Sequence, residues 1–284
     1  MSAASTALSV QGHSAPRWLY GTAWKEERTA ELVQLALNQG FRGIDTANQR
    51  KHYFEAAVGE ALQAVLAGSQ LQRADLFLQS KFTFRAGQDH RLPYDPEADF
   101  TTQVMQSFAR SLQHLQTDYL DSYLLHGPST GHGLQAADKE VWRAMEALQR
   151  SGQTRLIGVS NVNLQQLEQL LAFAEVPPAF VQNRCYAITG WDQAIRSLCR
   201  QHGIVYQGFS LLTANAQWLQ HSEVLALARQ YGAPPTQIVF AFALAVGMQP
   251  LTGTSRAEHM ALDLAASGLQ LTPAEIQTLE QLAR

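Results

Sequence analysis

The amino-acid sequence predicts an α/β fold, and within that class a single-domain (β/α)₈ TIM barrel. Short apolar runs rich in β-branched or aromatic residues recur from Trp18 onward, and the chain contains eight of them. A stretch with apolar residues at helical spacing follows each run. Parallel strands need such crossover connections, and eight strand–helix units close a sheet into a barrel. An open doubly wound sheet is the alternative architecture.

The eight runs are the predicted strands of this barrel. Each combines apolar residues with β-branched or aromatic ones, as strands do. In chain order they cover residues 18–22, 42–46, 76–82, 122–126, 155–161, 179–185, 203–210 and 249–255.

The segments between the runs predict helices, because their apolar residues recur every three or four positions. Asn161 is a candidate N-cap for the helix at 164–171. Thr272 and Pro273 favour the start of a last helix, with the threonine as N-cap and the proline in the first turn. The clearest apolar stripes are Val58, Leu62, Val65 and Leu66; Val104, Phe108, Leu112 and Leu115; and Leu164, Leu167, Leu170 and Leu171.

One domain accounts for the chain, because no linker, low-complexity tract or repeat divides it. Residues 1–16 are small and polar without a clear period, so we expect a poorly ordered tail or a loose hairpin there. The barrel domain is expected to span residues 17–284. No heptad pattern or large apolar surface run is present, and a monomer is therefore expected.

Composition and charge exclude several classes of function. The formal net charge of −3 gives no general electrostatic reason for nucleic acid or an anionic membrane as a partner. The longest apolar stretch, around 240–248, is much shorter than the ~20 residues that span a bilayer. The first residues lack the features of a secretory signal, and two cysteines are too few for a disulfide framework. We therefore expect a soluble, cytoplasmic protein.

Polar residues stand where the predicted strands end, which is where barrel enzymes carry their chemistry. All of them are expected to face the same mouth of the barrel. They are Asp45, Lys81, His126, Ser160, Asn161, Gln182, Phe209 and Ser210, from the second to the seventh run.

Lys81 is one of only four lysines in the chain and lies between apolar neighbours. An unpaired charge there costs on the order of several kcal/mol, so Asp45 is expected to pair with it. A structural ion pair and a Schiff-base lysine are both open interpretations. Tyr53, on the loop after Asp45, is either a packing residue or a proton donor. A nearby ammonium would lower the pKa of the phenol below its usual ~10.

His126 is either a satisfied core residue or a catalytic group. His132 lies nearby, but the two histidines have no third ligand at a sensible spacing, and no HExxH motif is present. We therefore expect no metal. No phosphate-binding P-loop occurs either, and GHGLQA at 131–136 is interpreted as a loop because it does not directly follow a strand.

Several motifs together resemble those of the aldo-keto reductases, which are NAD(P)H-dependent oxidoreductases on a (β/α)₈ barrel. The motifs are RGIDTA with a following tyrosine and VGEAL, then SKF, DSYLLHGP, IGVSN, FVQN, GFSLL and LTGTS. The resemblance runs from about residue 18 to residue 282. It implies that Asp45, Tyr53, Lys81 and His126 are catalytic, with Tyr53 as the general acid, Lys81 and Asp45 lowering its pKa, and His126 orienting the substrate carbonyl.

The resemblance also implies a cofactor site across the barrel mouth, with NADPH expected and NADH as the alternative. Ser160, Asn161 and Gln182 would hold the nicotinamide carboxamide, and Phe209 would stack on its ring. The loop after the eighth strand would take the adenosine 2′-phosphate end. The residues expected to bind the cofactor are Gly21, Thr22, Asp45, Ser160, Asn161, Gln182, Phe209, Ser210, Leu211, Gly253, Thr254, Ser255, Arg256 and His259.

Some positions depart from the family's pattern. Phe54 replaces the usual asparagine after the tyrosine, and Gly127 stands where many members carry a tryptophan, which implies a roomier substrate pocket. Gly253 and His259 stand near positions where many members have a lysine and an arginine that pair with the 2′-phosphate. Thr254, Ser255 and Arg256 are candidates to replace them, with Arg256 able to make a bidentate contact.

The expected function is reduction of a small-molecule aldehyde or ketone to an alcohol. One alternative is a cofactor-binding regulatory or redox-sensing protein on the same fold. A second, less favoured, is a lyase that forms a Schiff base at Lys81.

Overall fold

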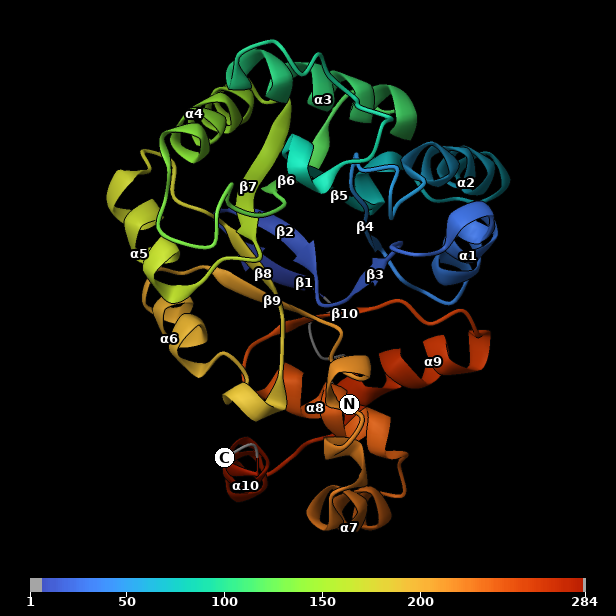
Figure 1. The fold of residues 1–284 in the computed structure, drawn as a ribbon. Helices are drawn as coiled ribbons and strands as arrows, with labels where there is room; N and C mark the ends of the chain where they lie inside the picture. The colour runs from blue at the N-terminus through green and yellow to red at the C-terminus, as the bar shows by residue number, and fades with distance from the viewer. Residues whose placement is uncertain (1–6, 283–284) are drawn as a thin grey trace.

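Eight parallel strands form a closed barrel in the computed structural model, which describes residues 7–282, and helices surround this barrel (Figure 1). The barrel closes where β10 pairs with β3, Leu251 opposite Leu19. This confirms the predicted barrel and excludes the open sheet. Each predicted run overlaps one strand, although two strands begin earlier than predicted, at Leu120 and Thr154. The strands are β3 (Leu19–Gly21), β4 (Gly43–Asp45), β5 (Phe77–Phe82), β6 (Leu120–Leu125), β7 (Thr154–Ser160), β8 (Phe180–Arg184), β9 (Val205–Phe209) and β10 (Gln249–Thr252).

Helices connect the strands and form the outer layer (Figure 1). They are α1 (Thr29–Asn38), α2 (Glu55–Gly68), α3 (Phe100–Leu115), α4 (Ala136–Arg150), α5 (Leu164–Phe173), α6 (Gln193–Gln201), α7 (Ser222–Tyr231), α8 (Pro235–Ala245), α9 (Ala257–Ala265) and α10 (Pro273–Gln281). Short 3₁₀ turns are η1 (Glu26–Arg28), η2 (Arg73–Asp75), η3 (Arg85–Gly87), η4 (Ala187–Thr189), η5 (Thr213–Asn215), η6 (Trp218–Gln220) and η7 (Ala266–Gly268).

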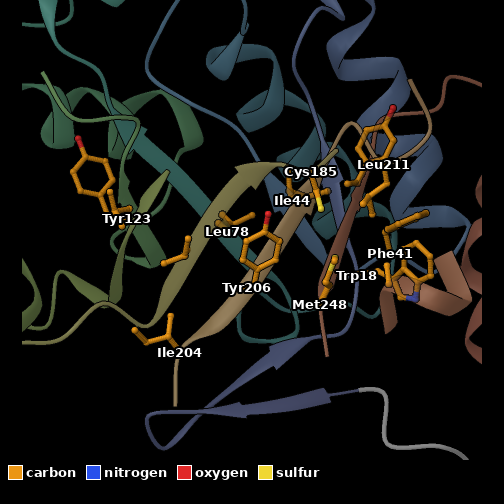
Figure 2. Close-up of a cluster of buried hydrophobic side chains, with 14 of the residues drawn as sticks. Trp18, Phe41, Ile44, Leu78, Tyr123, Cys185, Ile204, Tyr206, Leu211 and Met248 are labelled. Carbon is orange, nitrogen blue, oxygen red and sulfur yellow. The ribbon is translucent and has the colours of Figure 1, made fainter. Parts of the chain in front are cut away.

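The main apolar core lies between the strands and the helices. Figure 2 shows part of it, with Ile44, Leu78 and Tyr206 contributed by three different strands. Across this layer Phe108 of α3 meets Tyr123 of β6 edge to face, with 5.0 Å between ring centroids. Such contacts follow from the predicted periodicity, because one stripe of each helix faces the sheet.

A hairpin of β1 (Ala7–Val10) and β2 (His13–Pro16) lies beneath the amino ends of the barrel strands (Figure 2). Val10 and Ala15 pack against apolar side chains of the barrel interior. The hairpin therefore covers the end of the barrel opposite the predicted site. The sequence predicts a tail or loose hairpin over residues 1–16. Residues 1–6 of that segment lie outside the described residues.

Local hydrogen bonds define the helix caps, and they show that the predicted N-cap of α5 is wrong. Asn163 caps α5, since its side chain accepts a hydrogen bond from the Gln166 amide at 2.9 Å, and the Asn163 amide donates in turn to Oε1 of Gln166. Asn161 is not the cap. Its backbone is left-handed, with φ of 52°. The predicted N-cap of the last helix is confirmed, because Thr272 accepts from the Glu275 amide.

Buried glutamines form a hydrogen-bonded chain inside the barrel. Gln79 and Gln182 each donate to Asp45 Oδ1, at 2.7 and 3.0 Å. Both also donate to Gln207 Oε1 at 2.9 Å, and Gln207 Nε2 donates to Gln249 Oε1 at 2.9 Å. Gln249 in turn donates to the carbonyl at the end of β2. This glutamine chain therefore connects Asp45 to the hairpin, and each member is buried and bonded, as buried polar groups must be.

Candidate active site

A cavity of about 680 Å³ opens at the carboxyl ends of the barrel strands. Parallel register places the ends of neighbouring strands together, with Gly21 opposite Asp45 and Ser160 opposite Gln182. The cavity collects most of the residues singled out in the sequence: Gly21, Asp45, Tyr53, His126, Ser160, Asn161, Gln182, Phe209, Ser210, Leu211, Gly253, Thr254 and His259. Four others, Thr22, Lys81, Ser255 and Arg256, do not line it.

Asp45 and Lys81 form a buried ion pair behind the cavity wall. Lys81 Nζ lies 2.7 Å from each carboxylate oxygen of Asp45 and 2.8 Å from the carbonyl oxygen of Thr46. Three acceptors thus match the three N–H groups of the ammonium. Burial lowers the pKa of Lys81, and the contacts with Asp45 oppose this effect. The Thr22 hydroxyl donates to the Asp45 carbonyl at 3.0 Å and so fixes the backbone beside the pair.

Tyr53 lies on the loop between β4 and α2, with its ring against this pair. Lys81 Nζ is 5.3 Å from the ring centroid of Tyr53. Burial, and then the negative charge of Asp45, raise the pKa of the phenol above its usual value of 10.0. The predicted lowering by Lys81 is therefore wrong, because Asp45 neutralises the ammonium and desolvation disfavours the phenolate. The phenol is protonated at neutral pH.

His126 follows β6 and faces Tyr53, with 5.8 Å between ring centroids and a T-shaped arrangement. Burial and the positive charge of Lys81 lower the pKa of the imidazole to about 3, so the ring is neutral at physiological pH. Its Nδ1 lies 2.7 Å from the hydroxyl oxygen of Thr83, and this hydrogen bond orients the ring. The cavity therefore presents two uncharged groups side by side, the protonated phenol of Tyr53 and the neutral imidazole of His126.

The opposite wall comes from the ends of β7, β8 and β9. Ser160 donates to the Gln182 carbonyl at 2.7 Å, and Asn161 donates to the His126 carbonyl at 2.7 Å. Asn161 and Ser210 have left-handed backbones, with φ of 52° and 57°. Left-handed non-glycine residues are uncommon and gather at functional sites, where the surrounding fold holds them.

The outer rim is formed by the loop after β10 and the loop after β3. Lys25 donates to the carbonyl of Gly253 at this rim. Arg256 and Ser255 are exposed and lie outside the cavity lining, and Arg256 Nε is 3.6 Å from a carboxylate oxygen of Glu258. The cation at the rim is therefore Lys25, from the loop after β3, whereas the sequence predicts Arg256, from the loop after β10.

Sequence reasoning missed four residues of the site. Trp24 is 68% exposed, lines the cavity and stacks on His52 with 4.1 Å between ring centroids. Asp263, from α9, accepts a hydrogen bond from Thr252 at 2.7 Å, and burial raises the pKa of this carboxyl to about 6. Thr83 and Lys25 complete the group. Only Lys25 carried a sequence signal, as one of four lysines.

Metal-binding clusters and membrane-spanning helices are both absent from residues 7–282. No group of three or more His, Cys, Asp or Glu side chains is placed to hold a metal ion in that range. Within the same residues, no helix has both the length and the apolar character needed to cross a membrane.

Solved structures share this fold. The aldose reductase from Schistosoma japonicum superimposes with a TM-score of 0.83 over 97% of this chain and 91% of that protein, at 23% identity. Gox0644 in its apo form matches with a TM-score of 0.83 over 99% of this chain and 95% of that protein, at 25% identity.

Sequence comparison identifies the family. Human aldo-keto reductase family 1 member A1 is 31% identical over 264 residues, which are 84% of this chain and 76% of that protein. An uncharacterized oxidoreductase of Bacillus subtilis strain 168, YtbE, is 29% identical over 268 residues, which are 93% of this chain and 88% of that protein. The model of the aldo/keto reductase family matches residues 12–284. The chain therefore belongs to the aldo/keto reductase family of oxidoreductases.

Proposed function

We propose that this protein reduces the carbonyl group of a small aldehyde or ketone to an alcohol with a nicotinamide cofactor, NADPH in preference to NADH. The observation that carries the proposal is the meeting of Tyr53 and His126 at one cavity, directly in front of the Asp45–Lys81 pair. Family membership supports the carbonyl chemistry.

The residues that line the cavity suit a nicotinamide cofactor. Phe209 offers an aromatic face, and Lys25 offers a positive charge at the rim. Both N–H groups of the Gln182 amide donate within the protein, to Asp45 and Gln207, so its Oε1 is the atom that remains to accept from a carboxamide. The cavity volume falls within the range of about 300–1,000 Å³ that is typical of cofactor and ligand sites.

Tyr53 is proposed as the general acid. A bound reduced nicotinamide would supply the hydride that attaches to the carbonyl carbon. The Tyr53 phenol gives its proton to the carbonyl oxygen as negative charge develops there, so the product is a neutral alcohol. Lys81 lies 5.3 Å from the ring, and its ammonium offsets the negative charge of Asp45 beside the phenolate that remains. His126, held by Thr83, donates a hydrogen bond that orients the same carbonyl oxygen.

The Schiff-base alternative lacks structural support. Lys81 is completely buried, its ammonium has three acceptors, and it is not among the described residues that line the cavity. A nucleophilic amine must be reachable and unprotonated. No observation favours a purely regulatory role.

The Tyr53→Phe variant tests the proposal. We expect kcat for aldehyde reduction to fall by about 10²–10⁴-fold, while the Kd for NADPH in a calorimetric titration stays unchanged, because the phenol acts in proton transfer. A panel of aliphatic and aromatic aldehydes is assayed by the loss of reduced-nicotinamide absorbance.

Tyr119→Phe is the matched control, because Tyr119 lies against Arg73 and Arg155 and not at the cavity. It should retain full turnover. If Tyr53→Phe also retained most of its turnover, Tyr53 would lose the role of acid, and His126 and His52 would be examined next.

A further inference from the structure

A second cavity lies beside the loop that carries Tyr53. It has a volume of about 330 Å³ and is enclosed by this loop, the start of α2, the second half of α3 and the segment 91–93. The helices α2 and α3 are neighbours in the outer layer of the molecule (Figure 1). We call this space the α2 cavity. Tyr53 is the one described residue that lines both the α2 cavity and the catalytic cavity, so it lies between the two.

The lining of the α2 cavity is positively charged. Its arginines and histidine are Arg50, Arg91, Arg110 and His114. Among its described lining residues, Glu55 is the only carboxylate, and its oxygens are already engaged. Ser80 donates to one of them, and His114 Nδ1 lies 3.0 Å from the other. The excess of positive charge favours an anion in this cavity.

The three arginines differ in how far their charge is compensated. Arg91 forms an ion pair with Asp89, and Arg50 Nη2 lies 3.4 Å from a carboxylate oxygen of Glu27. Arg110, on α3, makes no hydrogen bond, ion pair or ring contact within residues 7–282. Its planar guanidinium can therefore bind an incoming anion through two parallel N–H groups.

The helix α2 begins at this cavity without a side-chain cap. Its N-cap residue is Phe54, whose side chain cannot accept a hydrogen bond. Glu55 and Ala56 line the cavity, and their amides have no hydrogen-bond partner within residues 7–282. The first N–H groups of a helix carry partial positive charge, so an uncapped start adds donors for an anion to those of Arg110.

Gln49 supplies a buried acceptor at the same cavity. It lines the cavity and is only 5% exposed. Its Nε2 donates to the Gly87 carbonyl at 2.6 Å, and this bond fixes the orientation of the side-chain amide because a carbonyl oxygen only accepts. Its Oε1 is buried and has no hydrogen-bond partner among the described residues. A buried acceptor without a partner is unfavourable, and a hydroxyl group of a ligand would supply the missing donor.

We propose that the α2 cavity binds a small phosphate monoester that carries a hydroxyl group. The phosphate lies against Arg110 and the uncapped start of α2, because its terminal oxygens can accept from both. The hydroxyl donates to Gln49 Oε1. The volume is at the lower end of the range of about 300–1,000 Å³ that is typical of ligand sites, which favours a small ligand. Binding requires neither a nicotinamide nor proton transfer from Tyr53, so this inference does not depend on the proposed function.

Calorimetric titration of the cofactor-free protein with glycerol 3-phosphate tests the proposal. We expect saturable binding, and we expect Arg110→Met to raise the Kd by about tenfold or more, because a charge-assisted hydrogen bond to the phosphate is lost. Arg229→Met is the matched control. Arg229 is an exposed arginine on α7 that does not line the α2 cavity, so its replacement should leave the Kd unchanged.

Ligand analogues test the acceptor separately from the cations. The analogue n-propyl phosphate has no hydroxyl group and should bind about two- to tenfold more weakly than glycerol 3-phosphate, because Gln49 Oε1 then stays without a donor. This difference between the two phosphates should disappear in Gln49→Met. Glycerol, which lacks the phosphate, should not bind measurably.

Three results would overturn the proposal. The first is the absence of saturable binding of glycerol 3-phosphate to the unmodified protein at millimolar concentrations. The second is equal affinity for glycerol 3-phosphate and n-propyl phosphate. The third is binding that Lys25→Met weakens and Arg110→Met does not, which would place the phosphate in the catalytic cavity. None of these results bears on aldehyde reduction, which is assayed separately with Tyr53→Phe.

Discussion

Burial decides the protonation states of the two rings that face each other in the cavity. His126 has its pKa lowered to about 3, and the pKa of Tyr53 is raised. Each group therefore remains neutral across the physiological range. The structure favours a site that works with neutral donors beside the charged Asp45–Lys81 pair.

This arrangement predicts a flat pH dependence for the chemical step. With cofactor saturating, kcat for reduction should vary by less than about twofold between roughly pH 5 and pH 8, because neither His126 nor Tyr53 titrates there. Saturation is needed because Asp263, which lines the same cavity, has a pKa of about 6. An inflection in kcat near the ordinary histidine pKa of about 6.5 would contradict a neutral, desolvated His126.

Single residues also show where sequence reasoning stops. The partnership of Lys81 and Asp45 could be predicted, because a lysine within an apolar strand needs a counter-charge and the adjacent strand ends in an aspartate. The direction of the Tyr53 pKa shift could not, since it depends on desolvation by groups distant in the sequence. The position of Lys25 could not either, because it depends on two left-handed residues that no pattern marks.

Among the secondary-structure elements, α2 and α3 make an unusually close contact. Gly59 on α2 faces the last turn of α3, and a Cβ atom added there would lie 1.9 Å from the carbonyl oxygen of His114. Backbone cannot retreat as a flexible side chain can. The glycine is therefore required by packing, and the two helices would separate if it were replaced.

Gly59→Ala should destabilise the protein by about 1–3 kcal/mol or more in urea unfolding, because it overpacks this contact. Gly68→Ala is the matched control on the same helix, since nothing lies within 4 Å of a Cβ at that position. It should be neutral or slightly stabilising, as alanine is the better helix former. Similar losses in both variants would show that the α2–α3 contact is not the cause.

The elements themselves could largely be predicted, because each depends on a local pattern. Six of the eight strands fall within the predicted runs, whereas β6 begins two residues and β7 one residue before its run. The apolar stripes of α2 and α3 face the core. The sequence predicts the N-cap of α5 at Asn161, two residues before the observed cap, because Asn161 and Asn163 are the same residue type in the same short segment. Only the reciprocal bond with Gln166 distinguishes them, and that bond is a property of the folded chain.

In the whole molecule, one end of the barrel is covered by the hairpin and the other opens as the cavity. Between the two ends, the core is continuous around the barrel, and both cysteines lie within it. Burial raises the pKa of the Cys185 and Cys199 thiols to about 12. Neither is oxidised to a disulfide with the other.

Both thiols should therefore be unreactive toward Ellman's reagent in the folded protein and should react together after denaturation in guanidinium chloride. The native and denatured proteins are compared at the same reagent concentration and pH. Cys199→Ala identifies which thiol is responsible for any signal. Rapid reaction of one thiol in the native protein would mean that the segment carrying it opens without global unfolding.

The glutamine chain inside the barrel also constrains how this sequence can change. Replacing Gln207 alone with leucine leaves amide groups of Gln79, Gln182 and Gln249 without partners, at about 1–3 kcal/mol for each buried group. Replacing all four glutamines at once leaves far fewer such groups, so the four substitutions are strongly non-additive. These positions form a single epistatic unit, and a lineage that leaves this arrangement must cross less stable intermediates to do so.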